Sequence, residues 1–234
     1  MNACLQCLLP IPELREHFIM QDYLSIAGER KKNNFEFCQK FHQFFSTVYS
    51  KSSEEKLWVL NPDLKKLVKK NFDPLMQHDS HEFLVYLFEQ LQDEQTPKSR
   101  EKFNGSESTK PVQQICNDYF RLHPSVIDSI FSGIQKTIVT CRKCSHASIT
   151  FNPFMTQSLS CKATLKKSLH DVFDQHQIDG MYICEKCKKA SKASVKHEIV
   201  KLPKVLIFHL KRFDAEFHKI KTSCDFDLDL NMTE

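Results

Sequence analysis

Glycine is scarce in this chain, which has only four among its 234 residues: Gly28, Gly105, Gly133 and Gly180. Phosphate-binding loops and dinucleotide-binding fingerprints need several glycines at short, fixed offsets, because the backbone there must approach the phosphates closely. No two of the four glycines have such a spacing. The scarcity therefore excludes a nucleotide-binding loop of either kind.

Long apolar runs are also missing. None approaches the roughly 18–20 residues that a membrane-spanning helix requires, so we expect no membrane partner. The N-terminus has no basic stretch followed by an apolar one, and we therefore expect no secretory signal. Ten cysteines without such a signal argue against a disulfide scaffold and for a reducing compartment, the cytoplasm or the nucleus.

Charge of one sign is not concentrated in the sequence. The formal net charge is +4, and lysine and arginine are spread along the chain. This distribution favours an ordinary solvated surface over a nucleic-acid footprint, so we expect no direct contact with nucleic acid. A hydrophobic content of 41% is sufficient for a substantial core and too high for a disordered chain.

Helices are predicted for residues 1–95. Asp79 and Glu82 have the spacing of a capping box, with Asp79 as the N-cap residue and Glu82 in the first turn. Pro62 is suited to open another helix. Apolar residues at helical spacing mark the buried faces of two helices: Phe37, Phe41, Phe44, Phe45 and Val48, and Phe83, Leu84, Leu87, Phe88 and Leu91.

The second half of the chain has a different pattern. Residues 96–112 are polar, contain Pro, Gly and Ser, and are predicted to form a surface loop or insertion. The spacing of apolar residues between 165 and 173 predicts one short helix. Helices followed by strands indicate an α+β architecture. The predicted strands are 134–140, 148–151, 157–160, 194–200 and 205–213.

Four cysteines form two copies of the Cys-x-x-Cys motif: Cys141 with Cys144, and Cys184 with Cys187. Two intervening residues allow both thiolates of a pair to point at one ion, and two such pairs complete the tetrahedral shell of a structural zinc site. Reduced thiols without a metal and a redox-active pair are the alternatives. We expect structural zinc, because the motif is duplicated.

Several segments in order resemble the ubiquitin-specific protease family. Residues 1–8 look like the part of the family's cysteine box that follows its nucleophile. The stretch Gln77–Leu84 is similar to the family's Gln-Gln-Asp-x-x-Glu-Phe-Leu motif. The two cysteine pairs match its zinc-binding fingers. Leu202–Phe213 resembles a long strand of its palm.

The resemblance implies a papain-like cysteine protease hand, with a helical thumb in residues 1–95 and β fingers with part of the β palm in 113–234. It implies a thiol protease that hydrolyses isopeptide bonds at the ubiquitin C-terminus, and ubiquitin and ubiquitylated proteins as partners. Asp79 and Glu82 match family positions that contact two arginines of the ubiquitin tail. The capping box uses the same two carboxylates, and the two roles are compatible.

The residues that would perform catalysis are not found in the sequence. In the family, the nucleophilic cysteine precedes the Met-Asn pair that here is Met1 and Asn2, and the general-base box lies near the other end of the domain. We therefore assign no catalytic residue and expect the chain as given to be inactive. Cys4 and Cys7 are expected to be core thiols, and His209 a palm histidine.

Two further readings remain open. The chain could be a catalytically inactive ubiquitin-binding or scaffold protein, or a plain zinc module without a link to ubiquitin. A fainter resemblance, to the histone deubiquitinase of the SAGA coactivator, implies a SAGA-like complex as a partner. That resemblance rests on Phe131–Gly133, Asn152–Phe154 and Asp227–Met232.

Overall fold

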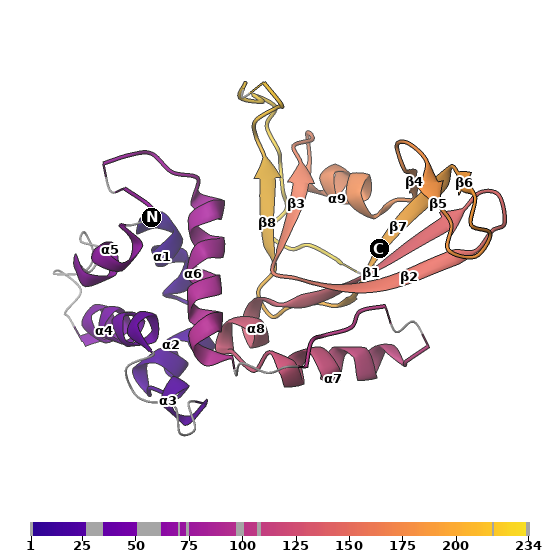
Figure 1. Cartoon of the computed structure of the whole chain (residues 1–234). Coiled ribbons are helices and arrows are strands. Elements are labelled where there is room, and N and C mark those ends of the chain that lie inside the picture. The colour runs from indigo at the N-terminus through magenta and orange to yellow at the C-terminus, as the bar shows by residue number, and fades with distance from the viewer. Residues whose placement is uncertain are drawn as a thin grey trace. The chain divides into compact units, whose positions relative to one another are not determined.

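The computed structural model describes residues 2–26, 35–50, 62–69, 71–73, 75–96, 101–106, 109–216 and 218–232 (Figure 1). The chain divides into two compact units. The first comprises residues 1–102 and 120–130, and the second comprises 103–119 and 131–234. Within the described ranges, no helix has both the length and the apolar character needed to cross a bilayer.

The first unit is built of helices. Its core is aromatic: Phe18 stacks on Phe45 with ring centroids 5.7 Å apart, and lies 5.4 Å from the ring of Phe41. All three side chains are fully buried. The helices are α1 (Asn2–Leu8), α2 (Pro12–Ile19), α3 (Tyr23–Ile26), α4 (Glu36–Ser50), α5 (Pro62–Val68), α6 (Ser80–Gln95) and α8 (Val126–Phe131).

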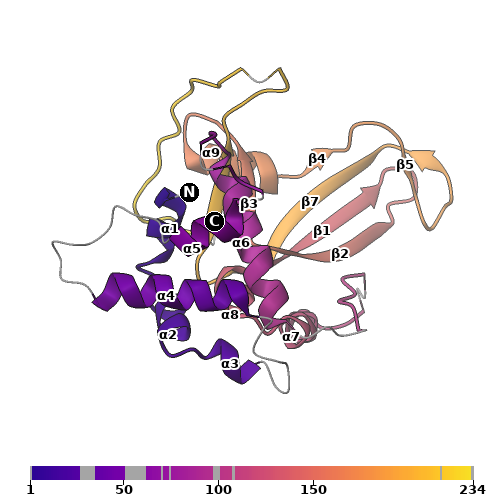
Figure 2. The ribbon, with the colours of Figure 1, turned by 60° about the vertical axis from the view of Figure 1, so that its left-hand side comes forward.

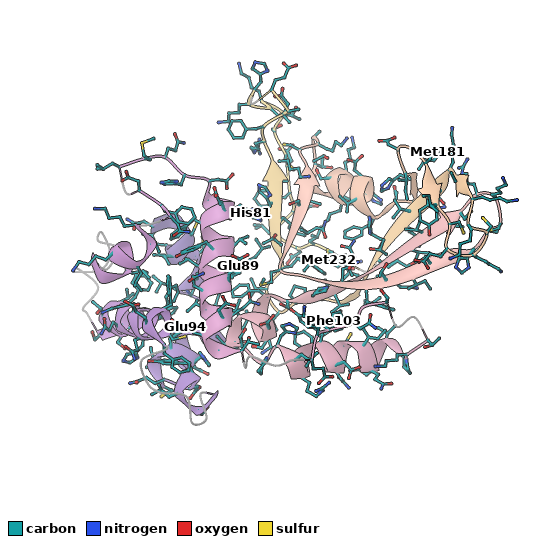
Figure 3. All side chains as sticks on the ribbon, in the orientation of Figure 1. His81, Glu89, Glu94, Phe103, Met181 and Met232 are labelled. Carbon is teal, nitrogen blue, oxygen red and sulfur yellow. The ribbon has the colours of Figure 1, made fainter. Side chains whose placement is uncertain are left out.

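Helix α4 begins where a glutamate of another helix caps it. Both carboxylate oxygens of Glu94, on α6, accept hydrogen bonds from backbone amides at the start of α4, one from Phe37 and one from Cys38, each at 2.8 Å. Such an acceptor satisfies amides that have no partner inside the helix. Figure 3 shows Glu94 near the end of α6. This contact fixes two helices of the first unit to each other.

The second unit contains the strands. Its main sheet has the order β2-β1-β7-β4, and two small sheets pair β3 with β8 in parallel and β5 with β6 in antiparallel. Helix α9 (Leu165–Phe173) and most of helix α7 (Val112–Leu122) also belong to this unit. The strands are β1 (Gly133–Cys141), β2 (Ala147–Phe154), β3 (Thr156–Ser160), β4 (His176–Gln177), β5 (Tyr182–Ile183), β6 (Ala190–Ser191), β7 (Ala193–Lys201) and β8 (Ile207–Lys211).

The long strands β1 and β7 run from one end of the sheet, at Ile134 and Lys201, to the end that carries Cys141 and Ala193, which is called the distal end below. Strand β1 is central and pairs antiparallel with both β2 and β7, as Figures 1 and 2 show. Gly133 begins β1 where a Cβ atom would lie 2.6 Å from the ring of Phe154 and 2.8 Å from the Lys201 carbonyl, so the three strands can approach closely only without a side chain there. At the other end, Cys141 stands opposite Ala193.

The structure confirms the predicted α+β fold class. Helices are present at each position where the sequence predicted one in the described residues, and each predicted strand is present with slightly different ends. The expectation that Cys4 and Cys7 are core thiols was wrong for Cys7, which is exposed, whereas Cys4 is half-buried. The reason is helical geometry: α1 buries Leu5 and Leu8, so residues one position earlier on each turn point away from the core.

Candidate metal centre and the start of helix α6

The four cysteines of the two Cys-x-x-Cys motifs converge at the distal end of the second unit. Their sulfur atoms all lie within 4.8 Å of one another. Cys141 and Cys184 are buried, and Cys144 and Cys187 are half-buried. Strand β1 delivers the first pair, and the short strands β5 and β6 flank the second. The sequence prediction that these residues gather into one cluster is therefore confirmed.

Each pair sits in a tight turn of the same form. The amide of Ser145 donates to the carbonyl of Cys141, and the amide of Lys188 donates to the carbonyl of Cys184, both at 2.9 Å. Ser145 and Lys188 each have a positive φ, 56° and 54°. This left-handed conformation, which suits glycine best, turns the chain back so that both thiols of a pair face the centre.

Hydrogen-bond donors surround the sulfur of Cys141. The hydroxyl of Ser191 lies 3.1 Å away. This contact is the main cause that lowers the pKa of the Cys141 thiol to about 6, and backbone amides of its own turn act in the same direction against the effect of burial. The thiolate is the form that binds a metal ion. Ser191 was not singled out from the sequence, because nothing in the Cys-x-x-Cys motif points to it.

The cluster has the size that zinc requires. A zinc–sulfur bond of about 2.3 Å in a tetrahedral shell places neighbouring sulfur atoms just under 4 Å apart, and the sulfurs of Cys144 and Cys184 are 3.6 Å apart. Four thiolates also fill that shell and leave no open position for a water molecule. The donor set therefore fits a closed, structural site better than a catalytic one.

The thiols of the cluster differ in their acidity. The amide of His146 lowers the pKa of Cys144, but burial and the neighbouring thiols outweigh it and raise that pKa to about 11. Cys184 receives backbone amides from its own turn, and its pKa is lowered. Thiols this close cannot all ionise without a compensating cation. The arrangement thus favours a bound cation over four free thiolates.

A second candidate site lies in the first unit, at the start of helix α6. The carboxylate of Asp79 accepts hydrogen bonds from the amides of His81 at 2.6 Å and Glu82 at 3.3 Å, through the same oxygen, Oδ1. The predicted N-cap role of Asp79 is therefore confirmed. Both Asp79 and Glu82 are exposed, so both carboxylates are available to a ligand in solution.

Two other residues considered from the sequence, Cys4 and His209, have hydrogen-bond partners that are distant in sequence. Burial is the main cause that raises the pKa of the Cys4 thiol, which donates a hydrogen bond to the carbonyl of Ser80 at 3.4 Å. His209, on β8, is half-buried and lies 3.2 Å from the hydroxyl of Ser158 on the paired strand β3. These contacts are those of residues that stabilise the fold.

Comparison with known proteins shows to which family the chain belongs. The family model described as ubiquitin carboxyl-terminal hydrolase matches residues 1–234. The chain belongs to this family. Ubiquitin carboxyl-terminal hydrolase 2 of Bos taurus is 27% identical over 241 residues, which are 95% of this chain and 39% of the relative. Ubiquitin carboxyl-terminal hydrolase 3 of Homo sapiens is 29% identical over 273 residues, which are 97% of this chain and 51% of the relative.

Solved structures show the same family fold. A chain of the SAGA Ubp8/Sgf11/Sus1/Sgf73 DUB module bound to ubiquitin aldehyde is similar with a TM-score of 0.67 and 21% identity, over 97% of this chain and 49% of that chain. A chain of the same module bound to monoubiquitin is similar with a TM-score of 0.68 and 20% identity, and the coverage of both chains is the same. This ubiquitin carboxyl-terminal hydrolase chain thus spans about half, or less, of the relatives and structures it matches.

Proposed function

We propose that this chain forms the ubiquitin-binding frame of a cysteine-type deubiquitinase. The complete domain would be a thiol-dependent hydrolase of isopeptide bonds at the ubiquitin C-terminus. The observation that carries the proposal is the family match along residues 1–234. It is supported by the coincidence, in one chain, of the four-cysteine cluster and the two exposed carboxylates at the start of α6.

The cysteine cluster is proposed to hold one zinc ion through Cys141, Cys144, Cys184 and Cys187. When bound, the ion supplies free energy of folding, because it joins two turns that are distant in sequence. The residues of the chain do the rest: the hydroxyl of Ser191 and the amides of both turns stabilise thiolates. The zinc has no part in bond cleavage in this proposal.

No catalytic residue is assigned within this chain. A thiol protease needs an ionised nucleophile beside a base. The raised pKa of Cys4 and its hydrogen bond to a backbone carbonyl disfavour the thiolate, so Cys4 is a poor substitute for a nucleophile. We therefore propose that the chain alone binds ubiquitin conjugates without hydrolysing them. A catalytically inactive ubiquitin-binding scaffold is the second candidate, and it shares this expectation.

Asp79 and Glu82 are proposed to bind the two arginines of the ubiquitin tail. Carboxylates pair with arginine through charge-assisted hydrogen bonds. Because Oδ1 of Asp79 accepts both capping bonds, Oδ2 remains available for a guanidinium group. The positive end of the helix dipole also favours negative charge at this position. The side chain can therefore cap α6 and contact the tail at once.

Two substitutions of Asp79 separate these roles. Asparagine caps a helix about as well as aspartate but has no charge. We expect Asp79→Asn to keep the free energy of unfolding within about 0.5 kcal/mol of wild type while it weakens ubiquitin binding about tenfold, as Glu82→Gln also should. Urea unfolding and calorimetric titration with ubiquitin measure the two quantities.

The matched control for this experiment is Asp79→Ala, which removes both the cap and the charge. It should lower the free energy of unfolding by about 1 kcal/mol and weaken ubiquitin binding as much as Asp79→Asn does. If Asp79→Asn and Glu82→Gln both bind ubiquitin with wild-type affinity, the proposed tail contact is wrong, and capping of α6 is the role that remains for Asp79.

A SAGA-like complex, with a nuclear location, is a more specific proposal on partners. It rests on the resemblance of Phe131–Gly133, Asn152–Phe154 and Asp227–Met232 to a histone deubiquitinase. The Ubp8 chains similar to this one are solved within SAGA modules. Copurification of tagged protein with the other components of such a module tests it, and recovery of the protein free of them would count against it.

A further inference from the structure

The distal end of the second unit, around the metal cluster, is strongly basic. We call residues 141–146 and 181–192 the fingertip. It holds six cationic side chains, and every one of them is exposed. They stand inside the two cysteine turns or in the segment that follows the second turn: Arg142, Lys143, Lys186, Lys188, Lys189 and Lys192.

None of these six cations is neutralised by the part of the protein that the structure describes. The ion pairs among those residues involve other lysines and arginines. The fingertip has a single acidic residue, Glu185. Zinc held by four thiolates would add two negative charges, which still leaves a clear positive excess. Chelation of a metal therefore does not explain the whole basic cluster.

A backbone hydrogen bond joins the two segments of the fingertip. The amide of Arg142 donates to the carbonyl of Lys192 at 3.0 Å, which ties the first cysteine turn to the end of the second. The sulfurs of the two turns lie within 4.8 Å of one another. At physiological salt, charges are screened over about 8 Å, so cations gathered around so small a centre act on a ligand together.

Apolar side chains stand beside these cations and face solvent. Met181 and Ile183 are 66% and 70% exposed. Ile183 belongs to β5, and Met181 directly precedes that strand. Figure 3 shows Met181 at the outer end of the second unit. A partner that carries apolar side chains could cover these two aliphatic groups and remove their surface from water.

We propose that the fingertip is a docking surface for an acidic protein segment in which apolar residues lie between carboxylates. Such a segment complements both parts of the surface: carboxylates meet the cations, and apolar side chains cover Met181 and Ile183. Nucleic acid matches it less well, because phosphates leave the aliphatic groups uncovered and the fingertip offers only Tyr182 and His146 for stacking on bases. This proposal does not depend on the chain binding ubiquitin.

Charge reversal on the fingertip tests the proposal. The probe is a fluorescein-labelled peptide of repeated Asp-Glu-Leu, whose binding to the full chain is followed by anisotropy. Each reversed surface charge contributes modestly, and three together should weaken binding about tenfold. The variant carries Lys143→Glu, Lys189→Glu and Lys192→Glu. Zinc content and circular dichroism must match wild type, which establishes that the variant is folded.

A matched control changes the net charge equally, at residues that do not belong to the fingertip. It carries Lys69→Glu, Lys102→Glu and Lys221→Glu, three exposed residues outside the fingertip. Its affinity for the Asp-Glu-Leu peptide should fall less than twofold. Equal loss in both triple variants would mean that only net charge matters, and would overturn the proposal.

The apolar part of the surface has its own test. Met181→Gln combined with Ile183→Thr keeps all charges, and should weaken the Asp-Glu-Leu peptide severalfold but leave a repeated Asp-Glu-Ser peptide unchanged. Two further results would overturn the proposal. One is tighter binding of a DNA duplex than of the peptide, lost in the fingertip variant. The other is self-association of the chain through the fingertip, seen by sedimentation.

Discussion

Lys188 follows the second cysteine pair in a conformation that is costly for any residue with a Cβ atom. Its φ is 54°, and a non-glycine residue in the left-handed region costs roughly 1 kcal/mol or more. Lys188→Gly and Lys188→Ala remove the same charge and differ only in this atom. We expect the glycine variant to be more stable than the alanine variant by about 1 kcal/mol, measured by urea unfolding of the zinc-loaded chain.

The neighbouring Lys189 provides the control for that measurement. It does not have a positive φ, so glycine there brings only the entropic cost of a more flexible unfolded chain. At this position the alanine variant should be the more stable one. The same order at both positions would show that the left-handed turn after the cysteine pair does not determine stability.

His17 gives the first unit a pH-dependent stability. Burial is the main cause that lowers the pKa of His17, and the nearby Asp22 carboxylate opposes this effect. The folded state therefore favours neutral imidazole. The stabilisation that neutral His17 gives the folded state is fully present above about pH 6.5, the ordinary pKa of histidine. It is lost as the pH falls through that pKa toward the lower pKa of His17 in the folded state.

The variant His17→Phe carries no titratable group at this position, and Phe18 and Tyr23 provide an aromatic environment for it. Its midpoint of thermal unfolding should fall less than that of wild type between pH 7.5 and pH 5.5. At pH 8 the imidazole is neutral in both states, so the remaining difference there reports packing alone. Parallel pH profiles of the two proteins would contradict the assignment.

At the scale of single residues, the sequence predicts the groups that belong to a motif. The four cysteines and Asp79 were identified because their spacing has a direct geometric meaning. Ser191 was not identified, because only the tertiary structure brings its hydroxyl within hydrogen-bond distance of Cys141. The exposure of Cys7 was also missed, since the family motif specifies a helix but not the direction in which it is buried.

Helix α4 illustrates how one element depends on another. Glu94 of α6 accepts two amides at its start. We expect Glu94→Ala to lower the free energy of unfolding by about 2 kcal/mol, because two amides of the first turn lose their acceptor. Urea unfolding followed by circular dichroism at 222 nm measures this loss.

Glu94→Gln is the matched variant for this element. This variant retains one side-chain oxygen as an acceptor, so its free energy of unfolding should fall less than that of Glu94→Ala. Burial is the main cause that raises the pKa of Glu94, so replacing the carboxyl by a neutral amide also removes the cost of a desolvated charge at neutral pH. A glutamine variant as unstable as the alanine variant would contradict the capping role.

At the scale of elements, periodicity predicted the long amphipathic helices and the strands around the cysteine pairs. It did not predict α7 and α8. Helix α8 buries Ile127, Ile130 and Phe131, and so short an element offers too few turns for its period to stand out. The two-residue strands β4, β5 and β6 exist only because the long strands and the cysteine turns position them.

For the whole molecule, the α+β class followed from the order of helices and strands. The hand-like fold came from the family resemblance, and solved structures with TM-scores of 0.67 and 0.68 agree with it. The sequence shows cations beside the cysteines, which would partly offset the charge of four thiolates, but it does not indicate a docking surface. Only the folded structure shows that these cations are exposed and have no ion pair among the described residues. It also shows that Met181 and Ile183 are exposed next to the second cysteine pair.

The most direct test of the account is native mass spectrometry of the chain mixed with a ubiquitin–aminocoumarin conjugate. One spectrum reports bound zinc, bound conjugate and any cleavage of the conjugate. We expect one zinc ion and one intact conjugate on each chain. Zinc without the conjugate would contradict a ubiquitin-binding frame, and release of free ubiquitin that depends on Cys4 or Cys7 would contradict the assignment of catalysis to the complete domain.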